Sequence, residues 1–139
     1  GNIKTKDKMQ RIDTNLLNGV TAQAKESPRL RMNYNFHASL EAKAQRLLNA
    51  LEPGTVLPVH RHPHTAETYL LLRGRIRVMF YNEAKEETES TVLDPLTGDY
   101  GVHIPAGQWH TLEVLESGSV LFEVKDGPYT PLGEDDLLI

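Results

Sequence analysis

Residues 54–74 read GTVLPVHRHPHTAETYLLLRG, and this stretch holds the highest density of metal-binding side chains in the chain. Three of the six histidines, His60, His62 and His64, fall within five residues, and Glu67 follows them. Alternate side chains of a strand project from one face, so His60 and His62 can share a metal ion. Glu67 can return on the next strand as a third ligand. The stretch therefore predicts a metal site built on a hairpin.

A second segment can close this site. Residues 105–110 read PAGQWH, a tight turn followed by His110, which can reach the metal from another strand. Three imidazoles and one carboxylate suit one divalent transition metal, Fe, Mn, Ni, Co or Zn, and the sequence does not choose among them. His64 shares the parity of His60 and His62, but Pro63 interrupts a regular strand there. We therefore expect His64 at the rim of the site.

Outside these motifs, short apolar segments alternate with turn residues. The strands that this pattern predicts lie at residues 29–38, 55–59, 68–72, 75–81, 90–93, 102–104, 111–115 and 120–125. The charged run at 82–89 predicts an exposed hairpin tip. Residues 13–25 carry a helical apolar pattern that ends before Pro28. The fold class that follows is all-β, a sandwich or barrel, with a short N-terminal helix.

The two histidine segments resemble the two motifs of the cupin superfamily. The first motif is matched in spacing by Gly54, His60, His62, Glu67 and Gly74. The second motif is matched by Pro105, Gly107 and His110. The resemblance implies a single cupin (jelly-roll) β-barrel, a metal held by His60, His62, Glu67 and His110, and a homodimer.

Three further segments are similar to the WbuC-type cupin metalloproteins, which are found among bacterial surface-polysaccharide genes. These segments are residues 27–37 (SPRLRMNYNFH), 45–54 (QRLLNALEPG) and 122–129 (FEVKDGPY). With the two motifs, the resemblance covers most of residues 27–131. It implies that residues 45–51 form a strand entering the barrel, although the composition of this region favours a helix.

Length and composition predict one domain. The chain has 139 residues, of which 39% are hydrophobic and 24% charged, close to globular averages. We expect an N-terminal helical extension at residues 1–26, the cupin barrel at 27–131 and a loosely held acidic C-terminal tail at 132–139.

The same numbers exclude several classes of function. The net charge of −4 provides no basic excess for nucleic-acid binding, and the lack of cysteine excludes disulfides, thiolate metal sites and a cysteine nucleophile. The first residues are polar, and no apolar run approaches membrane-spanning length. We therefore expect a cytoplasmic protein with neither nucleic-acid nor membrane partners.

The polar face of the strand at residues 29–38 has two interpretations. An edge strand with one side in solvent would show the same alternation of polar and apolar residues. Alternatively, the strand lies near the barrel mouth, where guanidinium and amide groups hold carboxylate, phosphate or sugar hydroxyls beside the metal. The ligand-binding candidates on this face are Arg29, Arg31, Asn35 and His37, and the resemblance adds Lys125 and Tyr129. We expect at least Arg31 to point toward the metal-bearing cavity.

Other residues receive structural interpretations. We expect His103, between two apolar residues, to face outward, and Trp109 to pack at a sheet surface or subunit interface. Arg73, Arg75 and Arg77 have the spacing of an exposed strand face.

Three functions are compatible with such a site for a small polar or anionic ligand. The metal can act as a Lewis acid on a carbohydrate-related ligand of surface-polysaccharide metabolism, in an isomerase or epimerase reaction. The chain can instead be an Fe(II)-dependent dioxygenase, or a non-catalytic, metal-dependent sugar-binding or sensing module. No general base stands out, and His37 and Tyr129 qualify only within hydrogen-bond reach of a bound ligand.

Overall fold

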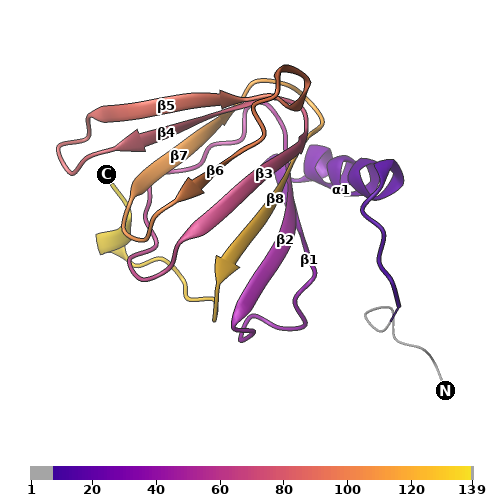
Figure 1. The fold of residues 1–139 in the computed structure, drawn as a ribbon, viewed down its shortest axis with the longest axis horizontal. Coiled ribbons are helices and arrows are strands. Elements are labelled where there is room, and N and C mark those ends of the chain that lie inside the picture. The colour runs from indigo at the N-terminus through magenta and orange to yellow at the C-terminus, as the bar shows by residue number, and fades with distance from the viewer. Residues whose placement is uncertain (1–7, 139) are drawn as a thin grey trace.

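A computed structural model describes residues 8–138, which form two antiparallel sheets with a helix against one of them (Figure 1). The helix is α1 (Thr14–Glu26). The strands are β1 (Arg31–Asn35), β2 (Ala44–Leu51), β3 (Glu67–Arg73), β4 (Ile76–Tyr81), β5 (Glu87–Leu93), β6 (Gly101–Ile104), β7 (Trp109–Val114) and β8 (Ser119–Asp126). Short 3-10 turns, η2 (Pro95–Thr97) and η3 (Glu134–Asp136), follow β5 and β8. One sheet has the order β1-β2-β8-β3-β6, and the other has the order β5-β4-β7.

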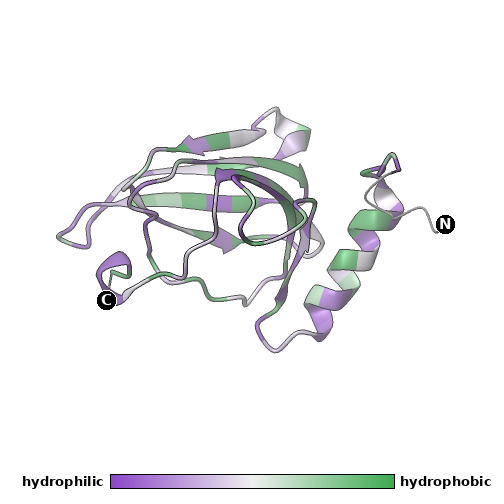
Figure 2. Ribbon diagram, turned by 90° about the horizontal axis from the view of Figure 1, so that it is seen from below, coloured by the Kyte–Doolittle hydropathy of each residue, from purple (hydrophilic) through white to green (hydrophobic). Residues whose placement is uncertain are grey.

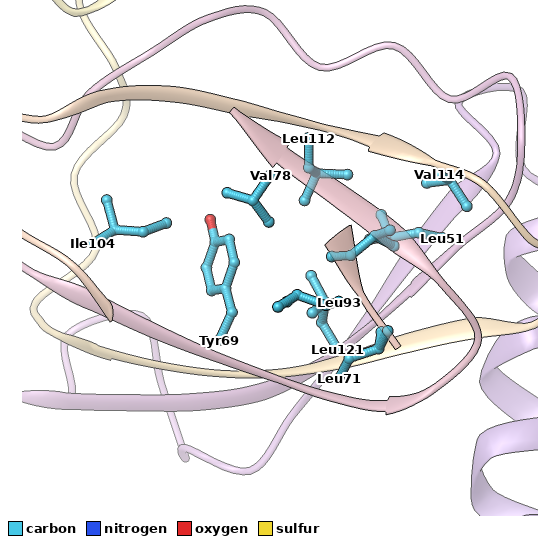
Figure 3. Close-up of a cluster of buried hydrophobic side chains, with 10 residues drawn as sticks. Leu51, Tyr69, Leu71, Val78, Leu93, Ile104, Leu112, Val114 and Leu121 are labelled. Carbon is cyan, nitrogen blue, oxygen red and sulfur yellow. The ribbon is translucent and has the colours of Figure 1, made fainter. Parts of the chain in front are cut away.

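The inward-facing apolar side chains of both sheets form the barrel core (Figure 3). Its buried members are Leu51, Tyr69, Leu71, Ile76, Val78, Leu93, Ile104, Leu112, Val114 and Leu121. These residues alternate along their strands with outward-facing ones, as expected of a sheet that buries one face. The core fills the end of the barrel near the β3–β4 turn, where Gly74 adopts a left-handed φ of +95°. A Cβ at this position would collide with Ser119 on β8, so glycine is required there.

Helix α1 lies against the outer face of the larger sheet (Figure 2). Asp13 caps its first turn by accepting a hydrogen bond from the backbone N–H of Leu16 at 3.0 Å. Its buried residues Leu17, Val20 and Ala24 pack on outward-facing side chains of β1, β2 and β8. These three strands therefore bury apolar residues on the outside of the barrel, while their inner face carries both core residues and polar residues that line a cavity.

Arg73 fastens this helix to the barrel. Its guanidinium donates to the Gly118 carbonyl at 2.8 Å, to Asn18 Oδ1 at 2.8 Å and to Thr21 Oγ1 at 3.1 Å. The expectation of a uniformly exposed arginine face is therefore wrong for Arg73. Arg75, by contrast, is exposed.

Most of the predicted elements are present. The helix, the strand at 45–51 and the strands from residue 68 onward are confirmed, and the fold is all-β with a short N-terminal helix. The predicted hairpin tip is shorter than the charged run, because β5 begins at Glu87. His103 is exposed on the outer face, with its Nδ1 3.0 Å from Thr68 Oγ1.

The strand predicted at residues 55–59 is wrong. This segment has no regular ladder, and pairing starts only with isolated bridges that join His60 to His110 and to Leu137. The first two histidines of the sequence motif therefore lie on an irregular segment and not on a hairpin strand.

The C-terminal residues pack against this irregular segment. The backbone N–H of Arg61 donates to the Asp136 carbonyl at 3.0 Å, and that of Leu138 donates to the Val59 carbonyl at 2.8 Å. The Arg61 side chain pairs with the Asp136 carboxylate at 3.3 Å. The expectation of a loosely held tail is therefore wrong for residues 133–138.

Helix α1 is too short and too polar to serve as a membrane span, and no other helix of residues 8–138 qualifies.

Candidate metal centre and its cavity

The two histidine motifs meet through their backbones. His60 and His110 exchange two hydrogen bonds, N–H to carbonyl, at 3.0 and 2.9 Å, and the Gly107 N–H donates to the His62 carbonyl at 2.9 Å. This pairing places the His60 and His110 rings with their centroids 4.3 Å apart. The irregular segment and the start of β7 thus act as one scaffold for the imidazoles.

Backbone carbonyls determine which ring nitrogen of two histidines carries the proton. His60 Nδ1 lies 2.9 Å from the Pro58 carbonyl, and His110 Nδ1 lies 2.8 Å from the Gln108 carbonyl. Because a carbonyl only accepts, each Nδ1 must donate, and each Nε2 is left with its lone pair. Metal-ligating histidines commonly show this arrangement, in which a hydrogen bond from the other nitrogen orients the ring.

The three imidazoles and Glu67 converge. One ring nitrogen from each of His60, His62 and His110 lies within 4.8 Å of the others. At the start of β3, Glu67 Oε1 is 2.6 Å from His62 Nε2, and Oε2 is 3.7 Å from His110 Nε2. Oε2 is buried without a hydrogen-bond partner in the described chain, an arrangement that is costly unless a cation or donor is supplied. The donor set therefore fits a divalent transition metal.

The protonation states suit metal binding. Burial, with His110 and His62 nearby, lowers the pKa of His60 to about 4. Burial alone would raise the pKa of Glu67, but His110 and His62 outweigh it and hold this pKa well below its usual range. At neutral pH, His60 is neutral and Glu67 is ionised, as coordination requires. His64 is exposed and lies outside the cluster.

The cluster lies in the wall of a cavity of about 270 Å³ inside the barrel. Arg31 and Lys125 line the same cavity. Arg31 is half-buried and donates to Thr55 Oγ1 at 3.3 Å and to the Val56 carbonyl at 3.2 Å. The cavity is small, and its wall carries the carboxylates of Glu67 and Glu123 beside these cationic groups, so its size and polarity suit a small polar molecule.

The other ligand-binding candidates do not line this cavity. Arg29 lies in the turn before β1, where Leu30 adopts a left-handed φ of 56° and breaks the strand alternation. His37 Nδ1 contacts the backbone N–H and carbonyl of Arg46. Asn35, at the end of β1, is exposed. Tyr129 is 47% exposed and lines a neighbouring hollow that shares His62 and Lys125 with the cavity.

A family described as Domain of unknown function (DUF6016) matches residues 12–93, more than half of the chain. The chain belongs to this family. The match extends from α1 to β5 and includes His60, His62 and Glu67.

Solved structures identify the fold of this DUF6016 chain as a cupin. The capsular polysaccharide assembling protein CapF of Staphylococcus aureus superposes with a TM-score of 0.62 at 20% identity, over 76% of this chain and 28% of that chain. The cupin domain of Schizosaccharomyces pombe Cnp3 superposes with a TM-score of 0.55 at 13% identity, over 69% of this chain and 64% of that chain. At these identities the similarity establishes the fold alone.

A curated relative is the mannose-1-phosphate guanylyltransferase of Salmonella montevideo. It is 32% identical over 91 aligned residues, and the alignment covers 63% of this chain and 17% of the relative. The chain therefore corresponds to a small part of that protein.

Three polar residues on the inner face of the barrel were not among the predicted site residues. Glu123 on β8 is 8% exposed and accepts a hydrogen bond at 3.1 Å from Asn49 Nδ2 on β2. Burial, followed by the charge of Glu67, raises the pKa of Glu123. The buried Tyr69 hydroxyl lies 3.4 Å from His110 Nε2, beside the metal cluster. Glu123 stands two residues after Leu121 in an apolar strand, so both side chains face inward. A charged residue at such a position is the feature of the sequence that could have identified Glu123.

Trp109 lies away from the cluster, packed beneath a cation. It is 7% exposed, and the Arg61 guanidinium carbon lies 4.4 Å from its ring centroid. Arg61 thus contacts both Trp109 and Asp136. Because Arg61 lies between His60 and His62, it links these two candidate ligands to the C-terminal segment.

Proposed function

We propose that this cupin binds one divalent transition metal through His60, His62, Glu67 and His110 and presents it to a small, anionic, carbohydrate-related ligand. The proposal rests on one observation: the four ligands share a cavity with Arg31 and Lys125. A bound metal in such a site supplies Lewis-acid polarisation of a ligand oxygen, the chemistry of isomerases and epimerases.

The chain's own residues have separate parts in this proposal. Backbone carbonyls orient His60 and His110 before any metal arrives, which reduces the ordering needed on binding. Arg31 and Lys125 hold the anionic end of the ligand through charge-assisted hydrogen bonds. The barrel walls enclose the site and strengthen these interactions by lowering the local dielectric.

Two of the similar proteins support the carbohydrate part of the proposal by their names. One is a mannose-1-phosphate guanylyltransferase, and another is a capsular polysaccharide assembling protein. Both names concern sugars, and a sugar acid or sugar phosphate has the negative charge that Arg31 and Lys125 would bind.

Elemental analysis and a ligand screen test this function together. Protein purified without added metal should contain about one equivalent of a divalent transition metal, and sugar acids or sugar phosphates should raise its melting temperature. Lys125→Met should reduce that stabilisation without loss of metal. Absence of metal after purification and failure to bind any added divalent ion would contradict the proposal. Product formed under strictly anaerobic conditions would exclude the oxygen-dependent alternative for that reaction.

A further inference from the structure

Glu123 is a buried carboxylate in the cavity wall that does not belong to the metal-ligand set. Its strand position faces Tyr69 on β3, so its side chain lies on the inner face of the sheet. Glu123 is 8% exposed, and it lines the same cavity as the four candidate ligands. A carboxylate that is this deeply buried normally requires full hydrogen bonding or a counter-ion.

The hydrogen bonding of Glu123 is incomplete. Asn49 Nδ2 donates to Oε1 at 3.1 Å, and no other group of residues 8–138 donates to this carboxylate. The amide oxygen of the same Asn49 is buried and also lacks a hydrogen-bond partner in the described chain. An unsatisfied buried polar group costs about 1–3 kcal/mol. Glu123 Oε2 accepts no hydrogen bond from residues 8–138 and belongs to a residue that lines the cavity, whereas Asn49 Oδ1 is shielded and out of reach of a ligand.

Nearby cations do not satisfy these acceptors. Arg31 directs its hydrogen bonds to Thr55 and Val56. Lys125 lies within 4.0 Å of no carboxylate oxygen in the described residues, so it remains available for a ligand. The missing donor to Glu123 Oε2 must therefore come from whatever occupies the cavity.

We infer that Glu123 and Asn49 form a hydroxyl-recognition site, which rests on the proposed function and narrows its ligand to a polyhydroxylated acid of the sugar-acid class. A ligand hydroxyl group donates to Glu123 Oε2, Asn49 positions the carboxylate through Oε1, and the acid group meets Arg31 or Lys125. An acid of equal length without hydroxyls would leave Glu123 Oε2 unpaired and place a bare anion beside Glu123. Sites built to bind a hydroxyl discriminate strongly against analogues that lack it, for this reason.

Two probes of matched skeleton test this inference. D-glucarate and adipate have the same six-carbon chain and the same two carboxylates, but only D-glucarate carries hydroxyls. Their affinities are measured by calorimetry on the full chain loaded with Zn²⁺, for wild type and Glu123→Gln. Any contact of a glucarate hydroxyl with the metal is common to both proteins. The affinity that D-glucarate loses on Glu123→Gln, divided by the affinity that adipate loses, therefore reports on residue 123 alone.

We expect wild type to bind D-glucarate more tightly than adipate. Glu123→Gln preserves the acceptor for Asn49 but replaces the other acceptor with an N–H donor, so it should weaken D-glucarate about 10- to 100-fold. Adipate should change less than about threefold or bind more tightly, because a negative charge is removed. Lys125→Met is the matched control and should weaken both probes equally.

The outcomes separate the inference from the function on which it rests. Equal losses for both probes in Glu123→Gln overturn the hydroxyl-recognition site and leave the metal-dependent anion site standing. If neither probe binds Zn²⁺-loaded wild type, the hydroxyl-recognition site is overturned, whereas the metal site of the proposed function is judged separately by elemental analysis. Should Glu123→Gln fail to fold, Asn49→Ala is judged by the same comparison, because it removes the hydrogen bond that positions the Glu123 carboxylate.

Discussion

The backbones of His60 and His110 exchange a pair of hydrogen bonds at 3.0 and 2.9 Å. This pair joins the two histidine motifs independently of the imidazoles, and a second carbonyl contact on each residue orients the ring. The scaffold is therefore made by main-chain atoms. Substitution of the ligand side chains should remove metal binding while leaving the scaffold intact.

Metal binding is the first property to test. The combined change His60→Ala and His62→Ala should abolish it, because His110 and Glu67 alone rarely hold a borderline divalent ion. Elemental analysis of the purified proteins measures the stoichiometry. His64→Ala is the control and should keep the wild-type content, since His64 is exposed and outside the cluster. Stoichiometric metal in the double variant would refute the ligand assignment.

The metal-free protein should lose stability on mild acidification. The pKa of His60 is about 4 in the fold and 6.5 as the ordinary value, so the unfolded chain takes up a proton first as the pH falls. The contribution of His60 to the free energy of unfolding should fall by about 3 kcal/mol between pH 6.5 and about 4. Below about pH 4 this contribution should stay constant. The lowered pKa of Glu67 acts in the same direction at lower pH, and the raised pKa of Glu123 opposes both.

Urea unfolding of the metal-free protein across this range measures the effect. His60→Ala should flatten the pH dependence between 6.5 and 4, because the group that titrates there is removed. A wild-type stability that rises on acidification through this interval would show that the fold does not hold His60 neutral.

Arg31 and Arg29 form a matched pair for the anion site. Arg31 lines the cavity, whereas Arg29 lies in the preceding turn and is exposed. Arg31→Ala should weaken D-glucarate binding to the Zn²⁺-loaded protein by about 10- to 100-fold, the value of one charge-assisted hydrogen bond. Arg29→Ala should leave the affinity unchanged. Calorimetry measures the affinity of both variants. Equal losses of affinity would mean that the arginines attract the ligand through long-range charge and not through a direct contact of Arg31.

Arg73 should matter for stability and not for binding. Its three hydrogen bonds join α1 to the barrel, so Arg73→Ala should lower the free energy of unfolding by about 2 kcal/mol. Arg75→Ala, at an exposed position on the same segment, should change it by less than about 0.5 kcal/mol. Urea denaturation distinguishes them, and similar values for both would mean that α1 is held by its apolar face alone.

The sequence by itself was sufficient for most elements that depend on spacing along the chain, but not for residues 55–59, which form no strand. Short apolar segments between turn residues identified the strands from residue 68 onward, and the apolar pattern that ends before Pro28 identified the helix. The spacing of His60, His62, Glu67 and His110 predicted one ligand cluster, and the structure brings these side chains together. Such local patterns are readable because they repeat with the geometry of the element that they form.

Tertiary structure alone decided which way each face points. Alternation shows that Arg31 and Asn33 share a side of β1, but the same pattern describes an edge strand in solvent. Because α1 buries the opposite, apolar side, the polar side lines the cavity. The same packing turns Glu123 and Asn49 inward from strands distant in sequence, and the turn at Leu30 leaves Arg29 outside. Periodicity determines which residues share a face, whereas burial against another element determines whether that face is inside.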